Sequence, residues 1–270
     1  MDMSSEELAG KARIDILRMI NRAGAAHIGS AFSAVDILAV LYSGILNVNS
    51  SEPMMPERDR FVLSKGHAGS ALYAILARRG FFDPSKLDHY SLDGSNLSGH
   101  VSSVGVSGVE VSTGSLGHGS SISAGMAYGA KLDAGSFRVF CLISDGECDE
   151  GPVWEAALFA AHHKLDNLVV IIDYNKIQSF GAVRDVLDLE PLADKWRSFG
   201  FEAREVDGHN HGDLTRVFGK VPWRSDKPNC LIAHTVKGKG VSFMENKLEW
   251  HYNQMNKEQF EKALEEIKKL

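Results

Sequence analysis

Two short apolar runs, each followed by a polar residue, constrain the fold of this chain most strongly. Val139–Ser144 is followed by Asp145, and Leu168–Tyr174 is followed by Asn175. Residues 153–164 between them have the pattern of an amphipathic helix, so the segment predicts two neighbouring parallel strands joined by a right-handed helical crossover. Asp145 and Asn175 would then lie together at the carboxyl ends of these strands, where open α/β sheets bind ligands.

The residue types at these two strand ends indicate a cation. A carboxylate and an amide both offer oxygen atoms, which hard divalent cations prefer as ligands. Mg²⁺ is usually held by one or two such ligands together with the phosphates of a substrate or cofactor. Asp145 and Asn175 therefore predict a metal–diphosphate site at the carboxyl edge of the sheet.

The remaining apolar patterns predict strands that alternate with helices. Further strands are expected at residues 60–64, 202–206 and 230–236, and helices at residues 4–23, 33–45, 66–79, 117–132, 190–199 and 256–270. Residues 24–29 interrupt the first two helices, and residues 91–115 form a long irregular segment of the kind that tends to be functional. This alternation predicts an α/β fold, a parallel sheet with helices on both faces. We expect one domain over residues 1–270, with a helical lobe over residues 1–60 as the alternative.

Composition narrows the classes of function. A formal net charge of −6 argues against non-specific binding to nucleic acid, which needs a basic surface. Residues 1–13 are polar and charged, unlike a signal peptide, and no apolar run approaches the roughly 20 residues that cross a membrane. The three cysteines, Cys141, Cys148 and Cys230, form no CxxC pair, which fits a reducing, cytoplasmic setting.

A glycine-rich stretch and four histidines are further candidates for a site. Residues 112–119 lead directly into a predicted helix, where glycines and the helix N-terminus can cradle a phosphate, although a plain tight loop explains them as well. His27, His67, His100 and His251 lie in predicted turns. Loop histidines can donate hydrogen bonds and carry protons near neutral pH, and the alternative for each is a structural or surface role.

Several motifs together resemble the N-terminal, diphosphate-binding part of the transketolase family. Asp145-Gly146, followed thirty residues later by Asn175, is similar to the thiamine diphosphate motif. Residues 63–68, 108–117, 150–156, 164–168, 173–177 and 237–245 also resemble transketolase sequence, in the family's order. The resemblance runs from about residue 5 to residue 255. It implies the thiamine diphosphate-binding fold and the transfer of a two-carbon ketol unit from a ketose to an aldose.

The resemblance also implies roles for individual residues. Asp145 and Asn175 would bind Mg²⁺ or Ca²⁺ through their side chains, and Ile177 through its backbone carbonyl. The implied cofactor contacts are His67, Gly114, Leu116, Asp145, Gly146, Glu147, Asn175 and His251. The catalytic residues would be His27, His67, His100 and His251, which bind donor hydroxyls and move protons above the thiazolium C2, and Glu150, which relays to a partner's glutamate at the dimer interface.

Three positions depart from the family pattern. Ser144 stands where Gly is usual before the Asp, Val101 where Pro is common after His100, and Tyr252 where Gly is common after His251. Metal binding should survive the first change, and the second alters the pose of His100. A bulky residue at position 252 would narrow the channel and change which sugar is accepted.

Length is the largest departure from the family. A full transketolase continues into a pyrimidine-binding domain, which carries the glutamate that activates the aminopyrimidine and most acceptor-phosphate contacts. The chain thus resembles the N-terminal subunit of a split transketolase, expected to act on sugar phosphates in an α₂β₂ assembly with a C-terminal subunit. The alternatives are the alpha subunit of a 2-oxo acid dehydrogenase, a deoxyxylulose-phosphate-synthase-like enzyme, or a cofactor-binding module without turnover. Residues 66–68 and 112–117 favour transketolase.

Overall fold

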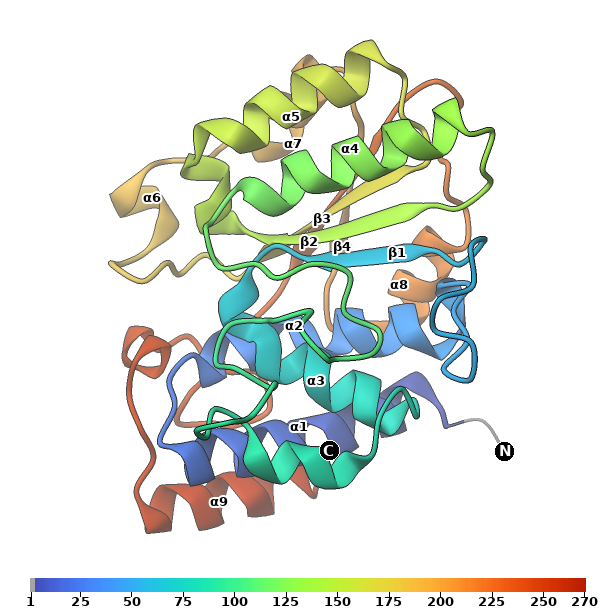
Figure 1. Ribbon diagram of the computed structural model, residues 1–270. Coiled ribbons are helices and arrows are strands. Elements are labelled where there is room, and N and C mark those ends of the chain that lie inside the picture. The colour runs from blue at the N-terminus through green and yellow to red at the C-terminus, as the bar shows by residue number, and fades with distance from the viewer. Residues whose placement is uncertain (1–2) are drawn as a thin grey trace.

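A parallel five-stranded sheet lies at the centre of the chain (Figure 1). The computed structural model describes residues 3–270. The strands lie in the order β1-β2-β3-β5-β4 and are β1 (Arg60–Leu63), β2 (Val139–Ser144), β3 (Leu168–Tyr174), β4 (Glu202–Asp207) and β5 (Asn229–His234). The register pairs Ser144 of β2 with Asp173 of β3. The residues that follow these two strands therefore meet at the carboxyl edge of the sheet.

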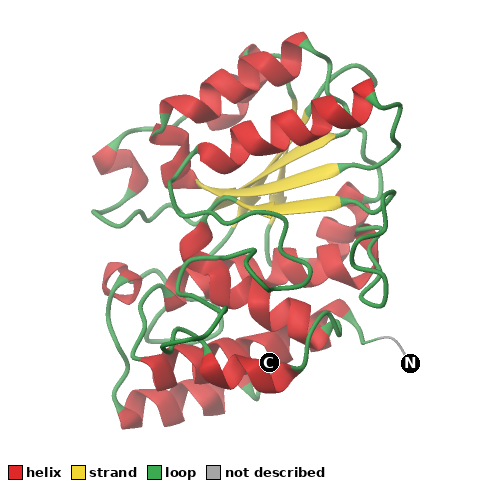
Figure 2. Cartoon of the chain, in the orientation of Figure 1, coloured by secondary structure: helices red, strands yellow, loops and turns green. Residues whose placement is uncertain are grey.

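Helices cover both faces of the sheet, which confirms the predicted fold class (Figure 1, Figure 2). One face carries α4 (His118–Leu132), α5 (Gly151–His162) and α7 (Leu192–Ser198). The other carries α2 (Ile28–Val40), α3 (Gly69–Arg78) and α8 (His211–Phe218), with α1 (Ser5–Ala23) and α9 (Lys257–Ile267) packed beyond them. Shorter segments are a π-helical turn (Leu41–Ile45), α6 (Val183–Val186) and 3₁₀ turns at Pro84–His89, Gly66–Ala68, Asp145–Asp149 and Leu248–His251.

The order of the strands explains which face is covered by the last helix of each crossover. The chain steps from β1 through β2 and β3 to β4 in one direction across the sheet, and then back from β4 to β5. Parallel crossovers are right-handed, so a step in the opposite direction places its helix on the opposite face. The forward steps accordingly end with α4, α5 and α7 on one face, and the backward step places α8 on the other.

Alternate side chains of each strand enter two separate apolar cores, because successive residues of a strand point to opposite faces. In β2, Phe140 and Leu142 pack with α2 and α3, whereas Cys141 and Ile143 pack with α4 and α5. Every residue of β2 and β3 is buried, as expected of parallel strands covered on both faces. Side chains of α1 and α2 belong to the same core as the adjacent face of the sheet.

The helices α2 and α8 differ from the sequence prediction. The break predicted at residues 24–29 is shorter, because α2 begins at Ile28 and not at residue 33. All of its residues are buried, so its first turn lacks the polar face that marks a surface helix in a sequence. The prediction also lacks α8, a short helix that begins after Asn210, whose side chain accepts a hydrogen bond from the N–H of Asp213.

The apolar segment Ile28–Ile45 is longer than the sequence prediction allowed. Its length and mean hydropathy of 1.6 would suit a membrane-spanning helix, but 83% of the window is buried inside the fold. A helix that is apolar all round is expected where protein surrounds it on all sides. The segment is therefore a core helix of this domain.

Candidate functional site

A cavity of about 350 Å³ opens at the carboxyl ends of β2 and β3. Asp145 directly follows β2 and Asn175 directly follows β3, so the sheet brings both side chains to the cavity, as predicted. Its wall also contains the other predicted site residues except Glu147: His27, His67, His100, Gly114, Leu116, Gly146, Glu150, Ile177 and His251. Residues from widely separated parts of the sequence therefore form one site.

The oxygen donors of this site are held by the backbone around them. The Asp145 carboxylate accepts hydrogen bonds from the N–H of Gly146 at 2.8 Å and of Lys176 at 2.6 Å. The Asn175 side-chain oxygen accepts from the N–H of Ile177 at 3.1 Å. Both side chains are almost fully buried. These contacts fix the carboxylate and the amide at the edge of the cavity.

The buried carboxylate of Asp145 would be stabilised in its charged form by a nearby positive group. Burial, together with the nearby Asp173 carboxylate, raises the pKa of Asp145 to about 6. A divalent cation beside this oxygen would offset the cost of its burial, so the donor set fits a hard metal ion. Within residues 3–270, no three His, Cys, Asp or Glu side chains are grouped to hold a metal. A cation here would therefore rely on the amide and carbonyl oxygens of Asn175 and Ile177 as well as on Asp145.

Two buried lysines, Lys65 and Lys237, line the cavity, and nothing in the sequence pattern had indicated a role for either. Lys65 forms an ion pair with Asp173, which also accepts hydrogen bonds from Ser33 and Thr235. The Lys237 ammonium donates to the Ile177 carbonyl at 2.9 Å and to His251 Nδ1 at 2.9 Å. Burial and the charge of Lys65 lower the pKa of Lys237 to about 8. Because Asp173 compensates the charge of Lys65, the Lys237 ammonium is the lysine that gives the cavity wall a positive group suited to a diphosphate.

Four imidazoles gather on one side of the cavity. The ring centroid of His27 lies 5.3 Å from that of His67, 5.7 Å from that of His100 and 5.1 Å from that of His251. Burial and neighbouring positive groups lower the pKa of His27 to about 4 and of His251 to about 3, and lower that of His67 as well. These three rings are therefore neutral at pH 7, and each can donate one hydrogen bond and accept another.

His27 is held in place by its own backbone. Its φ of 73° lies in the left-handed region and forms the turn just before α2. Its N–H donates to the backbone carbonyl of His251 at 2.9 Å, which ties the start of α2 to the last third of the chain. The sequence shows a histidine within Ala-Ala-His-Ile-Gly at this point, but the contact between distant loops is visible only in the structure.

Glu147 is not among the residues that line the cavity. Its side chain is fully buried and is not exposed to the cavity. The carboxylate accepts hydrogen bonds from the N–H of Gly117 at 2.9 Å, from the N–H of Ser144 at 2.8 Å and from the Ser64 hydroxyl. It thereby joins the ends of β1 and β2 to the turn before α4. The side chain of Glu147 therefore supports the backbone around the cavity and does not line it, whereas the direct cofactor contact expected for this position stays a prediction.

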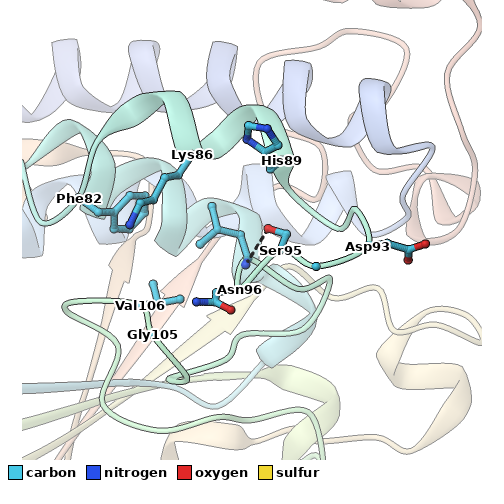
Figure 3. A pocket seen from close by; sticks show the side chains of 10 residues that line it. Phe82, Lys86, His89, Asp93, Ser95, Asn96, Gly105 and Val106 are labelled. Carbon is cyan, nitrogen blue, oxygen red and sulfur yellow. Dashed lines mark hydrogen bonds between the residues drawn. The ribbon is translucent and has the colours of Figure 1, made fainter.

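A second cavity, of about 320 Å³, lies between residues 82–89 and the irregular segment (Figure 3). Its lining is mixed: Phe82, Leu97 and Val106 are apolar, whereas Lys86 and Asn96 are polar. Among the described residues that line it there is no predicted site residue. The chemistry-bearing side chains are concentrated in the first cavity.

Similarity to known proteins agrees with this geometry. Residues 4–267 match the family described as transketolase, thiamine diphosphate binding domain. The chain belongs to the transketolase family. It is 42% identical over 257 residues to a subunit of the apulose-4-phosphate transketolase of Phocaeicola vulgatus, an alignment that covers 95% of this chain and 91% of that protein. It is 38% identical over 272 residues to the 6-deoxy-6-sulfo-D-fructose transketolase subunit SqwG of Clostridium sp., covering 99% of each.

Single-chain transketolases are more than twice as long as this chain. Human transketolase is 38% identical over 263 residues, covering 97% of this chain and 42% of that protein. The solved transketolase from Leishmania mexicana superposes with a TM-score of 0.93 at 27% identity, and that from Campylobacter jejuni with a TM-score of 0.90 at 31% identity. Each alignment covers at least 98% of this chain and 42% of the solved chain. The chain thus spans less than half of a single-chain transketolase.

The structure accommodates the three departures from the transketolase pattern. Ser144 has an extended backbone with φ of −89°, so its position does not require glycine. The N–H of Val101 donates to the Gly66 carbonyl at 3.0 Å, a bond that proline could not make. Tyr252 lines the cavity with 59% of its surface exposed, and its ring centroid lies 4.6 Å from that of His251. The tyrosine therefore stands at the cavity mouth, beside a predicted catalytic residue.

Proposed function

We propose that this chain is the thiamine diphosphate-binding subunit of a two-chain transketolase. The observation that carries the proposal is one cavity that holds three oxygen donors, two buried lysines and four imidazoles. The near-complete alignment with relatives that are named as transketolase subunits supports the two-chain form. All the relatives named above are transketolases, which favours ketol transfer over the chemistry of other thiamine diphosphate enzymes.

The residues present fit the cofactor and its metal. Asp145, Asn175 and the Ile177 carbonyl would hold Mg²⁺ or Ca²⁺, and Lys237 with His67 would contact the diphosphate. Gly114, Leu116, Gly146 and His251 would line the rest of the cofactor. When bound, thiamine diphosphate supplies the electron sink that permits cleavage of a carbon–carbon bond in a ketose. Orientation and charge compensation are the contributions of this chain.

The imidazoles are suited to hold sugar hydroxyls and to move protons. His27, His67 and His251 are neutral at pH 7, so each ring has one N–H donor and one acceptor nitrogen. In His251 the acceptor Nδ1 is bonded to Lys237, which leaves the Nε2–H to donate to a hydroxyl. His100 contributes a fourth ring to the same wall. A neutral ring beside a hydroxyl can take its proton as a general base and return it as an acid. Glu150 is exposed at the rim, a position from which it would face a partner glutamate.

The partner is the second part of the proposal. A C-terminal subunit with a pyrimidine-binding domain would cover the mouth of the cavity, where Phe180 is 84% exposed. We assign the complex an α₂β₂ composition and sugar or sugar phosphate substrates. The three cysteines are unpaired and buried, which supports a cytoplasmic location.

Calorimetry and product analysis test this function together. Thiamine diphosphate should bind in the presence of Mg²⁺ and the C-terminal partner, and chelation of the metal should abolish the binding. The complex should then transfer a two-carbon unit from hydroxypyruvate to an aldose phosphate, and should be inactive with pyruvate. Binding without metal, or turnover of pyruvate in place of hydroxypyruvate, would show that the site performs different chemistry.

A further inference from the structure

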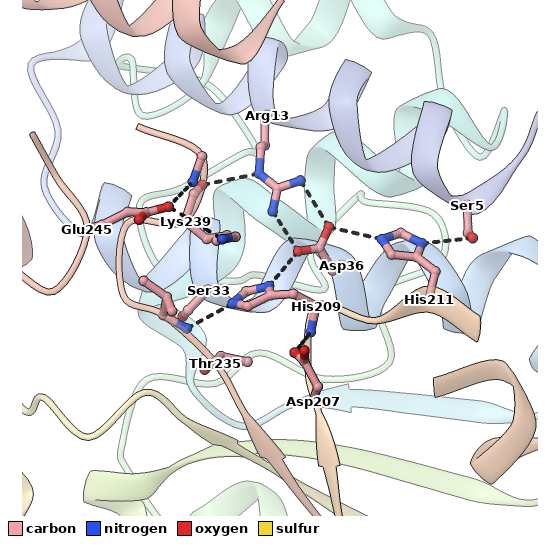
Figure 4. A network of polar contacts seen from close by, with 12 residues as sticks. Ser5, Arg13, Ser33, Asp36, Asp207, His209, His211, Thr235, Lys239 and Glu245 are labelled. Carbon is pink, nitrogen blue, oxygen red and sulfur yellow. Dashed lines mark hydrogen bonds and ion pairs between the residues drawn. The ribbon is translucent and has the colours of Figure 1, made fainter. Parts of the chain in front are cut away.

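A buried carboxylate, that of Asp36, lies at the centre of a polar network that includes Arg13, His209 and His211 (Figure 4). Asp36 of α2 is 4% exposed and accepts two hydrogen bonds from Arg13 of α1, at 2.9 and 2.6 Å. It also accepts from His209 Nδ1 at 2.7 Å and from His211 Nε2 at 3.2 Å. Four donors thus converge on one carboxylate and hold its pKa well below the usual range of an aspartate.

The Nε2 atom of His209 makes the contact that links this network to the backbone beside Lys237. His209 Nε2 lies 2.8 Å from the backbone nitrogen of Val236. A backbone N–H can only donate, so Nε2 must be unprotonated and the ring proton must sit on Nδ1, facing Asp36. The carboxylate therefore fixes the tautomer and the orientation of the ring, and the ring holds the backbone at Val236.

Arg13 holds the other end of the same short segment. Its Nε donates to the carbonyl of Lys239 at 3.3 Å. Between these two attachment points lies Gly238, whose φ of 78° and close approach to the Met244 carbonyl leave no space for a side chain. Residues 236–239 are thus held at both ends around a tight turn, and Lys237 projects from this turn into the cavity.

We infer that His209 is a positioning residue for the reaction, which acts by fixing the backbone from which Lys237 reaches the diphosphate-binding site. The inference rests on the proposed function, because the contact of Lys237 with the diphosphate is part of that proposal. Lys237 is 1% exposed and contacts both the Ile177 carbonyl and His251, so a small shift of its backbone would displace two site residues. His209 itself is separated from the cavity by this segment and needs no contact with substrate or cofactor.

Two conservative substitutions of His209 each retain a different one of its two hydrogen bonds, the bond to Asp36 or the bond from the Val236 N–H. His209→Asn retains a short amide that can donate to Asp36 but cannot reach Val236. His209→Gln places an amide oxygen near the position of Nε2, where it can accept from the Val236 N–H. His211→Asn is the control, because it shortens the other imidazole of the network and removes its donor from Asp36, whereas the ring of His211 bonds Ser5 and Asp36 and not residues 236–239.

The variants are tested in the full chain with its C-terminal partner. For His209→Asn we expect a roughly 10- to 100-fold rise in the Kd for thiamine diphosphate with Mg²⁺, and hydrogen exchange at residues 236–240 about 10-fold faster than in the wild type. His209→Gln should restore both values to within about 3-fold of the wild type, and His211→Asn should change neither by more than that.

Each other outcome overturns the inference. Equal exchange and equal Kd in His209→Asn and wild type would show that the ring does not position the segment. An equal effect of His211→Asn, or no rescue by His209→Gln, would show general loosening around Asp36. The hydrogen exchange is measured without cofactor, so it judges the positioning role even if the wild type does not bind thiamine diphosphate, a result that would instead refute the proposed function.

Discussion

At the scale of single residues, burial and neighbouring positive groups suppress protonation of the imidazoles in the cavity. Burial, His100 and the ammonium groups of Lys237 and Lys65 lower the pKa of His27 to about 4. In an unfolded chain the same ring titrates near about 6.5. Between these values the unfolded chain binds protons that the native chain does not. The free energy of unfolding therefore decreases as the pH falls from about 6.5 towards 4, and these rings have no such effect above pH 7.

His27→Asn tests this titration directly. Asparagine tolerates the left-handed backbone conformation of position 27, so the turn before α2 should be retained. With one titrating ring removed, the free energy of unfolding should depend less steeply on pH between about 4 and 6.5. Urea unfolding at several pH values measures this slope. Equal slopes in variant and wild type would mean that the pKa of His27 is not depressed by its surroundings.

Asp145→Asn should weaken the binding of thiamine diphosphate with Mg²⁺ without reducing the free energy of unfolding. The variant keeps one acceptor for the surrounding N–H groups but loses the charge that would face the metal. We expect the Kd for thiamine diphosphate with Mg²⁺ to rise at least about 100-fold. The buried charge carries a raised pKa, so its removal should not reduce the free energy of unfolding at pH 7.

Calorimetry with the partner present and urea unfolding of the same preparation provide the two values. Asp133→Asn, an exposed substitution, is the control. Near-wild-type affinity in Asp145→Asn would exclude Asp145 as the metal ligand.

Sequence alone could reach part of this residue-level picture. The position of Asp145 and Asn175 after apolar runs was enough to place them at one edge of the sheet, because parallel strands end together. The burial of Lys65 and Lys237 could not be predicted, since lysine is normally exposed and only the tertiary packing encloses it. Glu147 directly follows the cavity residue Gly146 in the sequence, yet its side chain turns inward to backbone N–H groups.

At the scale of secondary-structure elements, α4 depends on a close approach to the end of β1. A Cβ atom built on Gly119 would clash with the side chain of Ser64, whereas a Cβ on Gly125 of the same helix would meet nothing within 4 Å. Ser64 also donates to Glu147, which holds the turn before α4. The helix can therefore reach the sheet only because position 119 has no side chain.

A pair of alanine substitutions tests this packing. Gly119→Ala should lower the free energy of unfolding by about 1–3 kcal/mol, because the helix must move away from β1. Gly125→Ala should raise it by up to about 1 kcal/mol, because alanine favours a helix and no clash opposes it. Urea unfolding measures both. A stabilising effect of Gly119→Ala would show that α4 and β1 are not in close contact.

Helix boundaries were predicted well where one face is polar and poorly where it is not. α1 has Ser4 as its N-cap and an amphipathic pattern, and its prediction from residue 4 to residue 23 agrees closely with Ser5–Ala23. α2 is buried along its whole length, so its sequence contains no alternation from which to read its start. The sequence pattern locates the ends of a helix only where part of the helix faces solvent, because the contrast between polar and apolar positions is then present.

At the scale of the whole molecule, the protein closes the cavity on the side of the sheet, and the opposite side of the cavity is open to solvent. Leu116 and Glu150 line its rim, and Phe180 and Tyr252 are more than half exposed beside it. The parallel sheet and its helical layers were predictable from the alternation of strands and helices. The shape of the cavity was not, because loops from several separate parts of the sequence form it.

Reconstitution with the C-terminal partner tests the central claim most directly. Ketol transfer from hydroxypyruvate to an aldose phosphate should be measured while the partner is titrated into this chain at saturating thiamine diphosphate and Mg²⁺. We predict no turnover by either polypeptide on its own, and a rate that rises with added partner and reaches a plateau at one partner per chain. Full turnover by this chain in the absence of the partner, or no turnover at any ratio of the two, would contradict the account.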